Sequence, residues 1–311
     1  MTPTVHLPLI LNQEPRLKDL FGRHGIRFGF GVSASCFADA PWNKARYEIV
    51  TYHANIAAIA NGLKMEFTQP IKNVWDFSEG DAIVEAAHRL GIDVYGHALS
   101  WHMQNPDWLH AGEFDRDELA EILAIHVEAV SRHFKNKVCF LDVANEAYIQ
   151  PDGGVFGGEW QSLDEDYVTI SFQSSGVTPL YNSFFPHPEH EYAKALNLVD
   201  EGRAQAIGIQ LHVWDGSYQN TLYYTELLLK RIRERNGWCR FSEISVLAGS
   251  DWAQSIVYAE ITALAIKYKD IVRDFVVWDI KDPGWRGNVT LYDRDGKPKR
   301  AYAAMIEELR K

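Results

Sequence analysis

Short apolar runs alternate with longer amphipathic segments along most of the 311-residue chain. The short runs are rich in β-branched and aromatic residues, which is typical of strands buried on both faces of a parallel sheet. We expect strands over residues 26–32, 62–67, 92–99, 138–146, 179–185, 206–212, 239–247 and 275–279. The longer segments repeat apolar residues at three- and four-residue steps, which predicts helices over 16–23, 43–60, 116–134, 164–172, 189–201, 220–235, 253–268 and 301–311, and one that follows residues 76–78 and runs through 83 to 90.

This alternation of strand and helix, repeated about eight times, predicts the fold class. A right-handed series of parallel strands and crossover helices of that number closes on itself. We therefore expect an α/β protein, a single (β/α)8 TIM barrel. No Pro-rich, Ser-rich or charged linker divides the chain, so we expect residues 1–311 to form one domain with a barrel core at about 17–309.

Two of the expected strands carry a glutamate where a barrel would hold its chemistry. Asn145 and Glu146 end the apolar run 138–146, and Glu243 lies inside the run 239–247. An ionised carboxylate in such a strand is costly unless it faces a polar cavity. The strand ends of a barrel converge on one face, so Glu146 and Glu243 are candidates for the pair of carboxylates that glycoside hydrolysis requires.

Other polar and aromatic residues also fall where strands end. His212 precedes the Glu243 strand and is placed to hydrogen-bond its carboxylate, although a core histidine satisfied by the backbone has the same pattern. Trp278 and Trp285 either form platforms for sugar rings or pack under loops, and the sequence leaves both readings open. The further candidates are Lys64, His97, Trp101 and Gln210.

A metal site is the main competing interpretation of these residues. His97, His102, His212, Asp142 and Asp279 all lie on or after expected strands. Metal-dependent barrel hydrolases bring two histidines together from one strand as His-x-His, whereas His97 and His102 are five residues apart. The spacing therefore favours catalysis without a metal or cofactor.

Charge and composition exclude several other classes. There are 31 Lys and Arg against 42 Asp and Glu, a net charge of −11, which disfavours a nucleic-acid partner. No apolar run is long enough for a membrane span, and the first residues lack the pattern of a signal peptide. We therefore expect a protein that stays inside the cell or is a secreted enzyme shown without its signal. Cys36, Cys139 and Cys239 are expected to be buried thiols rather than disulfides.

Taken together, the motifs resemble glycoside hydrolase family 10, the endo-β-1,4-xylanases, over roughly residues 17–309. The segments that carry the resemblance occur in the family's order: Asn61-Gly62-Leu63-Lys64, His97-Ala98-Leu99-Ser100-Trp101-His102-Met103-Gln104, Asp142-Val143-Ala144-Asn145-Glu146, Gln210-Leu211-His212, Ser242-Glu243, Val277-Trp278 and Trp285-Arg286. Each segment is short, but the ordered set is highly specific.

The resemblance implies a retaining endo-1,4-β-xylanase that acts on xylan or xylo-oligosaccharides as a monomer. Glu146 would be the acid/base and Glu243 the nucleophile. His212, Asn145 and Gln210 would support the nucleophile and the bound sugar. Substrate would be bound by Asn61, Lys64, His97, Trp101, Gln104, Trp278 and Trp285.

Three positions depart from the family pattern. Ala60 stands where the family has an acid, Leu141 where it has a tryptophan, and Ser245 where it has an aspartate. Ser245 is two residues after Glu243, on the same side of the strand. Because serine carries no charge, we expect it to hold His212 more weakly than an aspartate would, and we expect an altered pH profile of activity. Two alternatives follow: another retaining β-glycosidase that cleaves β-glucan or a small xyloside, and a weakly active or non-catalytic descendant that binds xylo-oligosaccharides.

Overall fold

The computed structural model describes residues 14–38, 40–150, 154–185, 188–214 and 216–311. Eight parallel strands form a closed barrel in chain order, which confirms the predicted (β/α)8 TIM barrel. The strands are β1 (Arg27–Val32), β2 (Ile56–Ile59), β3 (Asp93–Gly96), β4 (Leu141–Asn145), β5 (Pro179–Ser183), β6 (Ala206–Val213), β7 (Cys239–Val246) and β8 (Val272–Val277). The expectations about residues 1–13 lie outside the described residues.

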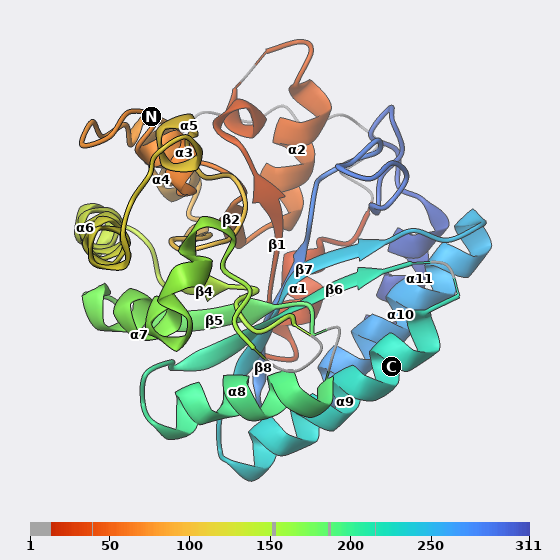
Figure 1. Cartoon of the computed structure of the whole chain (residues 1–311). Helices are drawn as coiled ribbons and strands as arrows, with labels where there is room; N and C mark the ends of the chain where they lie inside the picture. The colour runs from red at the N-terminus through yellow and green to blue at the C-terminus, as the bar shows by residue number, and fades with distance from the viewer. Residues whose placement is uncertain (1–13, 39, 151–153, 186–187, 215) are drawn as a thin grey trace.

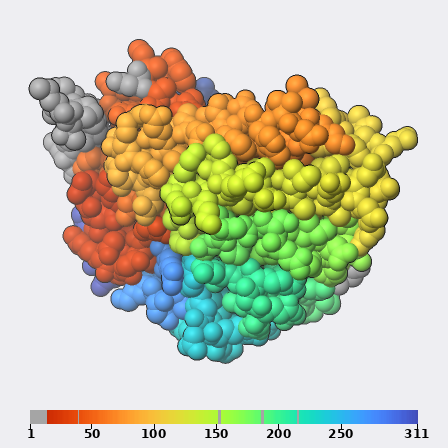
Figure 2. All heavy atoms as spheres, turned by 90° about the vertical axis from the view of Figure 1, so that its left-hand side faces the viewer, coloured from red at the N-terminus to blue at the C-terminus, as the bar shows by residue number. Residues whose placement is uncertain are grey.

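Helices surround the strands (Figure 1). The α-helices are α1 (Leu17–Gly22), α2 (Lys44–His53), α3 (Met65–Thr68), α4 (Ser78–Arg89), α5 (Asp107–His110), α6 (Arg116–Phe134), α7 (Glu165–Ser174), α8 (Pro188–Asp200), α9 (Tyr218–Glu234), α10 (Asp251–Lys267) and α11 (Arg300–Leu309), and the 3₁₀ segments are η2 (Ala34–Phe37) and η3 (Gly158–Leu163). Successive colours form adjacent bands in Figure 2, so consecutive strand–helix units lie side by side. Within the described residues, no helix combines the length and apolarity that a membrane span needs.

The second strand was predicted wrongly. The helix expected over 43–60 ends at His53, and residues 56–59 form β2 instead. All four residues of β2 are buried, so its pattern lacks the alternation that distinguishes a strand from a buried helix. Asn55 marks the break, because its side chain accepts the Phe28 N–H of β1 at 2.8 Å.

The strand expected over 62–67 is correspondingly wrong, because it is a turn followed by the single helical turn α3. Lys64 therefore precedes a short helix rather than lying in a strand. One cysteine prediction also needs correction: Cys139 precedes β4 and is only partly buried, whereas Cys36 and Cys239 are buried. All three are free thiols, as expected.

The core has two parts. A large cluster fills the space between strands and helices, as in other barrels. Inside the barrel there is a much smaller apolar cluster of Ile56, Ala58, Tyr95 and Val276. Ionisable residues occupy the interior beside it, among them the fully buried Arg240. The barrel interior is therefore unusually polar below the strand ends.

Candidate active site

A cavity of about 900 Å³ opens at the carboxyl ends of the strands. It brings together the residues predicted from the sequence: Asn61, Lys64, His97, Trp101, Gln104, Glu146, Gln210, His212, Glu243, Trp278 and Trp285 all line it. The twelfth, Asn145, is buried within hydrogen-bond distance of the lining residue Gln210, at 3.1 Å. Segments that are far apart in the sequence thus meet in one cavity.

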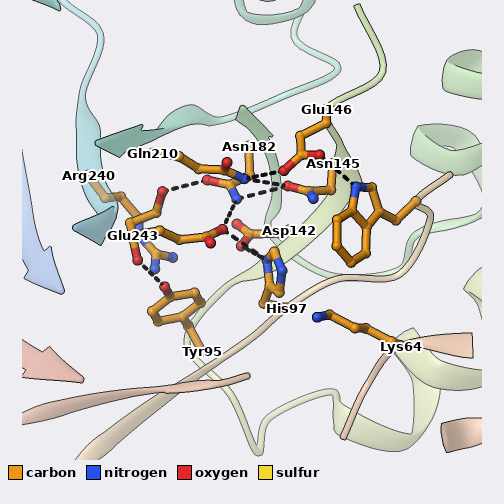
Figure 3. Close-up of polar contacts among 12 residues, drawn as sticks. Lys64, Tyr95, His97, Asp142, Asn145, Glu146, Asn182, Gln210, Arg240 and Glu243 are labelled. Atoms are coloured by element: carbon orange, nitrogen blue, oxygen red, sulfur yellow. Dashed lines mark hydrogen bonds and ion pairs between the residues drawn. The ribbon is translucent and has the colours of Figure 1, made fainter. Parts of the chain in front are cut away.

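Glu146 follows the last residue of β4 and leaves the strand sharply. Its φ of 54° lies in the left-handed region, which is uncommon for a residue other than glycine and often marks a functional site. The Glu146 N–H donates to the Asn182 carbonyl oxygen of the neighbouring β5 at 2.8 Å, which fixes the turn. The side chain consequently points from the strand end into the cavity (Figure 3).

The surroundings of Glu146 favour its protonated form. Burial raises the pKa of this carboxyl group, and the negative charge of Glu243 raises it further. Hydrogen bonds from Trp101 Nε1 (2.8 Å) and Gln210 Nε2 (3.0 Å) only partly offset these effects. His102 Nε2 lies 3.9 Å away, but burial lowers the pKa of that ring to about 4, so it is neutral near pH 7. Glu146 is therefore suited to donate a proton.

Replacing Trp101 with phenylalanine should move the high-pH limb of the activity profile upward. The substitution removes the indole N–H that stabilises the Glu146 carboxylate, so the pKa of Glu146 rises and the acid stays protonated to higher pH. We expect a displacement of about half to one pH unit, measured as kcat/KM against pH.

Trp108→Phe is the matched control, because its indole N–H donates to the Gln69 carbonyl oxygen outside the cavity. That variant should keep the wild-type profile. A high-pH limb that stays in place or moves downward in Trp101→Phe would contradict the role assigned to this hydrogen bond.

Glu243 has the opposite environment. It lies within β7 and is 4% exposed. Burial opposes ionisation, but the charge of His97, the contact with His212 and the hydrogen bond from Asn182 outweigh it and hold the pKa of Glu243 at about 2. The distances are 3.7 Å from His97 Nδ1, 3.4 Å from His212 Nε2 and 2.7 Å from Asn182 Nδ2. Glu243 is therefore an anion across the ordinary pH range.

Asn182 is the site residue that the sequence reasoning missed. Its backbone oxygen accepts from Glu146, and its side chain donates to Glu243. Ser242 Oγ donates to its side-chain oxygen at 2.5 Å. Gly208 on β6 leaves room for it, because a Cβ there would lie 2.1 Å from Asn182 Oδ1. The available signal was an amide side chain in the middle of a short apolar strand, where a buried polar group needs a partner.

His97 is oriented by a second buried acid. His97 Nδ1 lies 3.0 Å from Asp142 Oδ2, and both residues are almost completely buried. From the sequence, Asp142 was a possible metal ligand and part of a segment of the family resemblance, but not an expected partner of His97. The structure instead places it behind His97, where a carboxylate fixes the orientation of the ring that faces Glu243 (Figure 3).

Lys64 connects the polar residues on the β2–β3 side of the cavity. Its Nζ donates to Asn61 Oδ1 at 2.9 Å and to Gln104 Oε1 at 2.6 Å, and it lies 4.7 Å from the centre of the Trp101 ring. Burial lowers the pKa of Lys64 to about 8, although the charges of Glu243 and Glu146 oppose that effect. This group offers the donors, acceptors and aromatic face that a sugar ring requires.

Trp278 and Trp285 also line the cavity. Trp278 packs closely over Gly31, where a Cβ would lie 3.0 Å from the indole ring. Trp285 is 45% exposed and lies 5.0 Å from His212, measured between ring centres. Trp285 Nε1 donates to Ser245 Oγ at 3.1 Å. Ser245 therefore anchors Trp285, while His212 Nδ1 has no hydrogen-bond partner among the described residues.

Within the described ranges, no three His, Cys, Asp or Glu side chains are gathered as a metal site would need. Instead, one cavity holds two carboxylates whose pKa values are displaced in opposite directions. Such a pair can divide the work of proton donor and anionic nucleophile.

Comparison with known proteins agrees with this geometry. The sequence model of glycosyl hydrolase family 10 matches residues 16–308 of this chain. A β-1,4-xylanase of Dictyoglomus thermophilum is 28% identical, with 94% of this chain and 91% of that protein covered. Endo-1,4-β-xylanase A of Thermotoga neapolitana is 26% identical over 98% of this chain, which spans about a third (32%) of that longer protein.

Solved structures show the same fold. The crystal structure of native xylanase 10B from Thermotoga maritima has a TM-score of 0.86 and 25% identity, with 95% of this chain and 98% of that one covered. Xylanase 10B from Thermotoga petrophila, solved with xylobiose, has a TM-score of 0.86 and 24% identity, with 96% and 98% covered. The family match spans nearly the whole described barrel, and the chain therefore belongs to glycosyl hydrolase family 10 and is a glycoside hydrolase.

Proposed function

We propose that this chain is a retaining endo-1,4-β-xylanase that hydrolyses internal β-1,4-xylosidic bonds of xylan. The proposal depends mainly on one observation: Glu146 and Glu243 share a cavity, yet the pKa of the first is raised and that of the second is held at about 2. A retaining glycosidase needs this pairing of a protonated acid with an anionic nucleophile. The names of the relatives supply the substrate class.

In the first step, the Glu243 carboxylate attacks the anomeric carbon as the bond to the leaving oxygen breaks. Glu146 gives its proton to that oxygen, and a glycosyl ester forms on Glu243. In the second step, the Glu146 carboxylate takes a proton from water while the water oxygen attacks the anomeric carbon. Glu243 leaves as a carboxylate, and two inversions give net retention. No metal or cofactor takes part in this scheme.

The site supports these steps from both sides. Asn182, His97 and His212 contact the Glu243 carboxylate and keep it anionic between turnovers. The Lys64 group, with Asn61, Gln104 and Trp101, would hold the sugars on the non-reducing side of the cleaved bond. Trp278 and Trp285 would flank the cleft. Binding in a fixed geometry lowers the barrier because orientation is achieved before reaction.

Product analysis tests the proposal. We expect the wild-type protein to release short xylo-oligosaccharides from xylan, with the β-anomer appearing first by NMR, and to act far more slowly on mixed-linkage β-glucan. A chelator should leave the rate unchanged. Faster release from β-glucan would indicate another retaining glycosidase on this barrel, and tight binding of xylo-oligosaccharide without turnover would indicate a non-catalytic descendant.

A further inference from the structure

Arg240 is a charged residue with no place in the mechanism above. It lies on β7, three residues before Glu243, and is 0% exposed inside the barrel. Among the described residues, none of its three guanidinium nitrogens has a hydrogen-bond acceptor. Burying an ionised guanidinium in this way is unfavourable unless other interactions compensate. A residue that fills space at such a cost requires an explanation.

Arg240 is compensated by an aromatic face and a carboxylate. Its Cζ lies 3.3 Å from the centre of the Tyr95 ring, and its Nε lies 3.5 Å from Asp274 Oδ2. The negative face of an aromatic ring attracts a cation, and this attraction is strongest where water is excluded. Tyr95 is itself fully buried, so the guanidinium and the phenol ring form a stacked pair inside the barrel.

Tyr95 connects this stacked pair to the nucleophile. Its hydroxyl donates to the Ser242 carbonyl oxygen at 2.8 Å, and that carbonyl belongs to the peptide joining Ser242 to Glu243. The pairing register between β6 and β7 shifts at this point, between Ile209 and Gln210, so the ladder is irregular here. A side-chain hydrogen bond therefore fixes the peptide where regular pairing does not. Figure 3 shows Arg240, Tyr95 and Glu243 together on one side of the network.

Several buried carboxylates lie around the Arg240–Tyr95 pair. Asp142, Asp274 and Glu243 are three buried carboxylates within the barrel. The Tyr95 hydroxyl is within electrostatic range of all three and of Arg240, and the Arg240 guanidinium interacts with both aspartates. Arg240 supplies a buried positive charge among these acids, so less negative potential opposes ionisation of Glu243.

The other ionisable groups that face this region come from several elements. Those around Glu243 are His97 after β3, His212 on β6, Glu146 after β4, Lys64 before α3 and Asp142 on β4. Those around Arg240 are Tyr95 on β3, Cys139 before β4, Asp142 on β4 and Asp274 on β8, which also pairs with Arg27 on β1.

We propose that Arg240 is a positioning residue for the nucleophile: stacked on Tyr95, it holds the peptide that precedes Glu243 and supplies the buried positive charge that keeps the Glu243 carboxylate ionised. The inference rests on the proposed role of Glu243 and extends it to a residue outside the cavity lining. Arg240 acts through Tyr95 and through the electrostatic potential, without touching substrate.

Arg240→Met tests the electrostatic part, because it removes the charge and roughly keeps the volume. Without the cation the anionic form of Glu243 is less favoured, so the acid must lose its proton at higher pH. We expect the low-pH limb of kcat/KM, measured from pH 1 to 9 on an aryl xyloside, to move upward by about one pH unit from its wild-type position. Tyr95→Phe removes only the hydrogen bond to Ser242, so kcat should fall about fivefold to tenfold with the low-pH limb in place.

Arg27→Met is the matched control. Arg27 pairs with the same Asp274, at 2.7 Å, but it lies partly exposed at the start of β1. Losing it removes a cation from the same aspartate and should leave the low-pH limb where the wild type has it. An equal movement in Arg27→Met and Arg240→Met would overturn the inference, because the effect would then be one of charge anywhere near Asp274.

The inference would also be overturned if Arg240→Met folds and its low-pH limb stays at the wild-type position. Arg240 would then contribute only to packing and stability, whether or not the Tm of the variant is lower. If Arg240→Met does not fold, Arg240→Lys decides instead. Lysine keeps the cation but loses the planar stack, so we expect an unmoved limb and a lower kcat, and an unchanged kcat would refute the stacking role. Absence of xylanase activity in the wild type would refute the proposed function separately.

Discussion

Glu243→Ala should lower kcat on xylan by about 10⁴-fold or more, the largest effect expected of any substitution in this chain. The variant loses the group proposed to form the glycosyl ester, and the side chains of Asn182, His97 and His212 no longer have that carboxylate to contact. Measurement of reducing ends released from xylan gives the magnitude. The variant should keep the wild-type circular dichroism spectrum and bind xylo-oligosaccharides, because the substrate contacts lie elsewhere in the cavity.

Azide identifies the role that Glu243 loses. In the space left by the side chain, azide should attack the anomeric carbon of an activated aryl xyloside and give the inverted glycosyl azide. Glu128→Ala, a change on an exposed face of α6, is the control and should behave as the wild type. Undiminished hydrolysis in Glu243→Ala, or a retained azide product, would remove Glu243 from the position of nucleophile.

Glu146→Ala should lower kcat/KM on xylan by about 10³-fold, because the sugar leaving group then departs without a proton. Formation of the glycosyl ester should remain fast on substrates whose leaving group needs no protonation, such as a dinitrophenyl xyloside. The second step still lacks its base, so the ester should accumulate and a burst of phenol should precede a slow steady state. The high-pH limb of the profile should disappear, since Glu146 is the group that titrates there.

Azide again separates the roles. In Glu146→Ala it should attack the ester from the side that water normally uses and give the retained glycosyl azide, with a faster steady state. Equal losses on xylan and on the dinitrophenyl xyloside would contradict an acid/base role. Identical azide products from the two glutamate variants would show that the roles are not divided between Glu146 and Glu243 as proposed.

The positions of Glu146 and Glu243 were predictable because each interrupts an apolar strand. A carboxylate there cannot be explained by the core, so it indicates a cavity. His97 and Gln210 follow the same logic, and both line the cavity; Trp278 also lines it, although its sequence pattern left packing under a loop equally open. Seven of the eight strands were predictable because a barrel strand and its helix differ in the period of their apolar residues. The total of eight was nevertheless correct, because the wrongly expected strand at 62–67 replaced the missed β2 in the count.

The second strand escaped prediction because tertiary burial removed its signal. Ile56–Ile59 is covered on both sides, by the barrel interior and by helices, so neither face carries polar residues. Ala57 and Ala58 are also favourable in a helix, and they follow shortly after α2. A single helix over 43–60 was therefore consistent with the sequence. These four residues form a strand because they pair with β1 and β3, and local sequence patterns do not report such pairing between segments.

The partners of the catalytic groups were harder to predict than the groups themselves. Asn182 contacts Glu243 across 61 residues of sequence. Ser245 lies beside His212 in the β6–β7 register, as expected, but its hydroxyl accepts a hydrogen bond from Trp285, 40 residues further along the chain. Periodicity places a residue on a face, but it does not say which side chain of a neighbouring strand reaches it. Among the described residues His212 Nδ1 has no hydrogen-bond partner, and the weaker contact between Ser245 and His212 stays a prediction.

Trp285 and its anchor Ser245 come from different kinds of structure. Trp285 belongs to the loop after β8, whereas Ser245, Asn182 and both glutamates lie in strands or directly at their ends. The residues proposed to break the bond are thus part of the strand framework, and the loop that carries Trp285 is a separate layer around them. Selection or engineering can vary that layer to accept differently decorated chains while the chemistry beneath it is inherited intact.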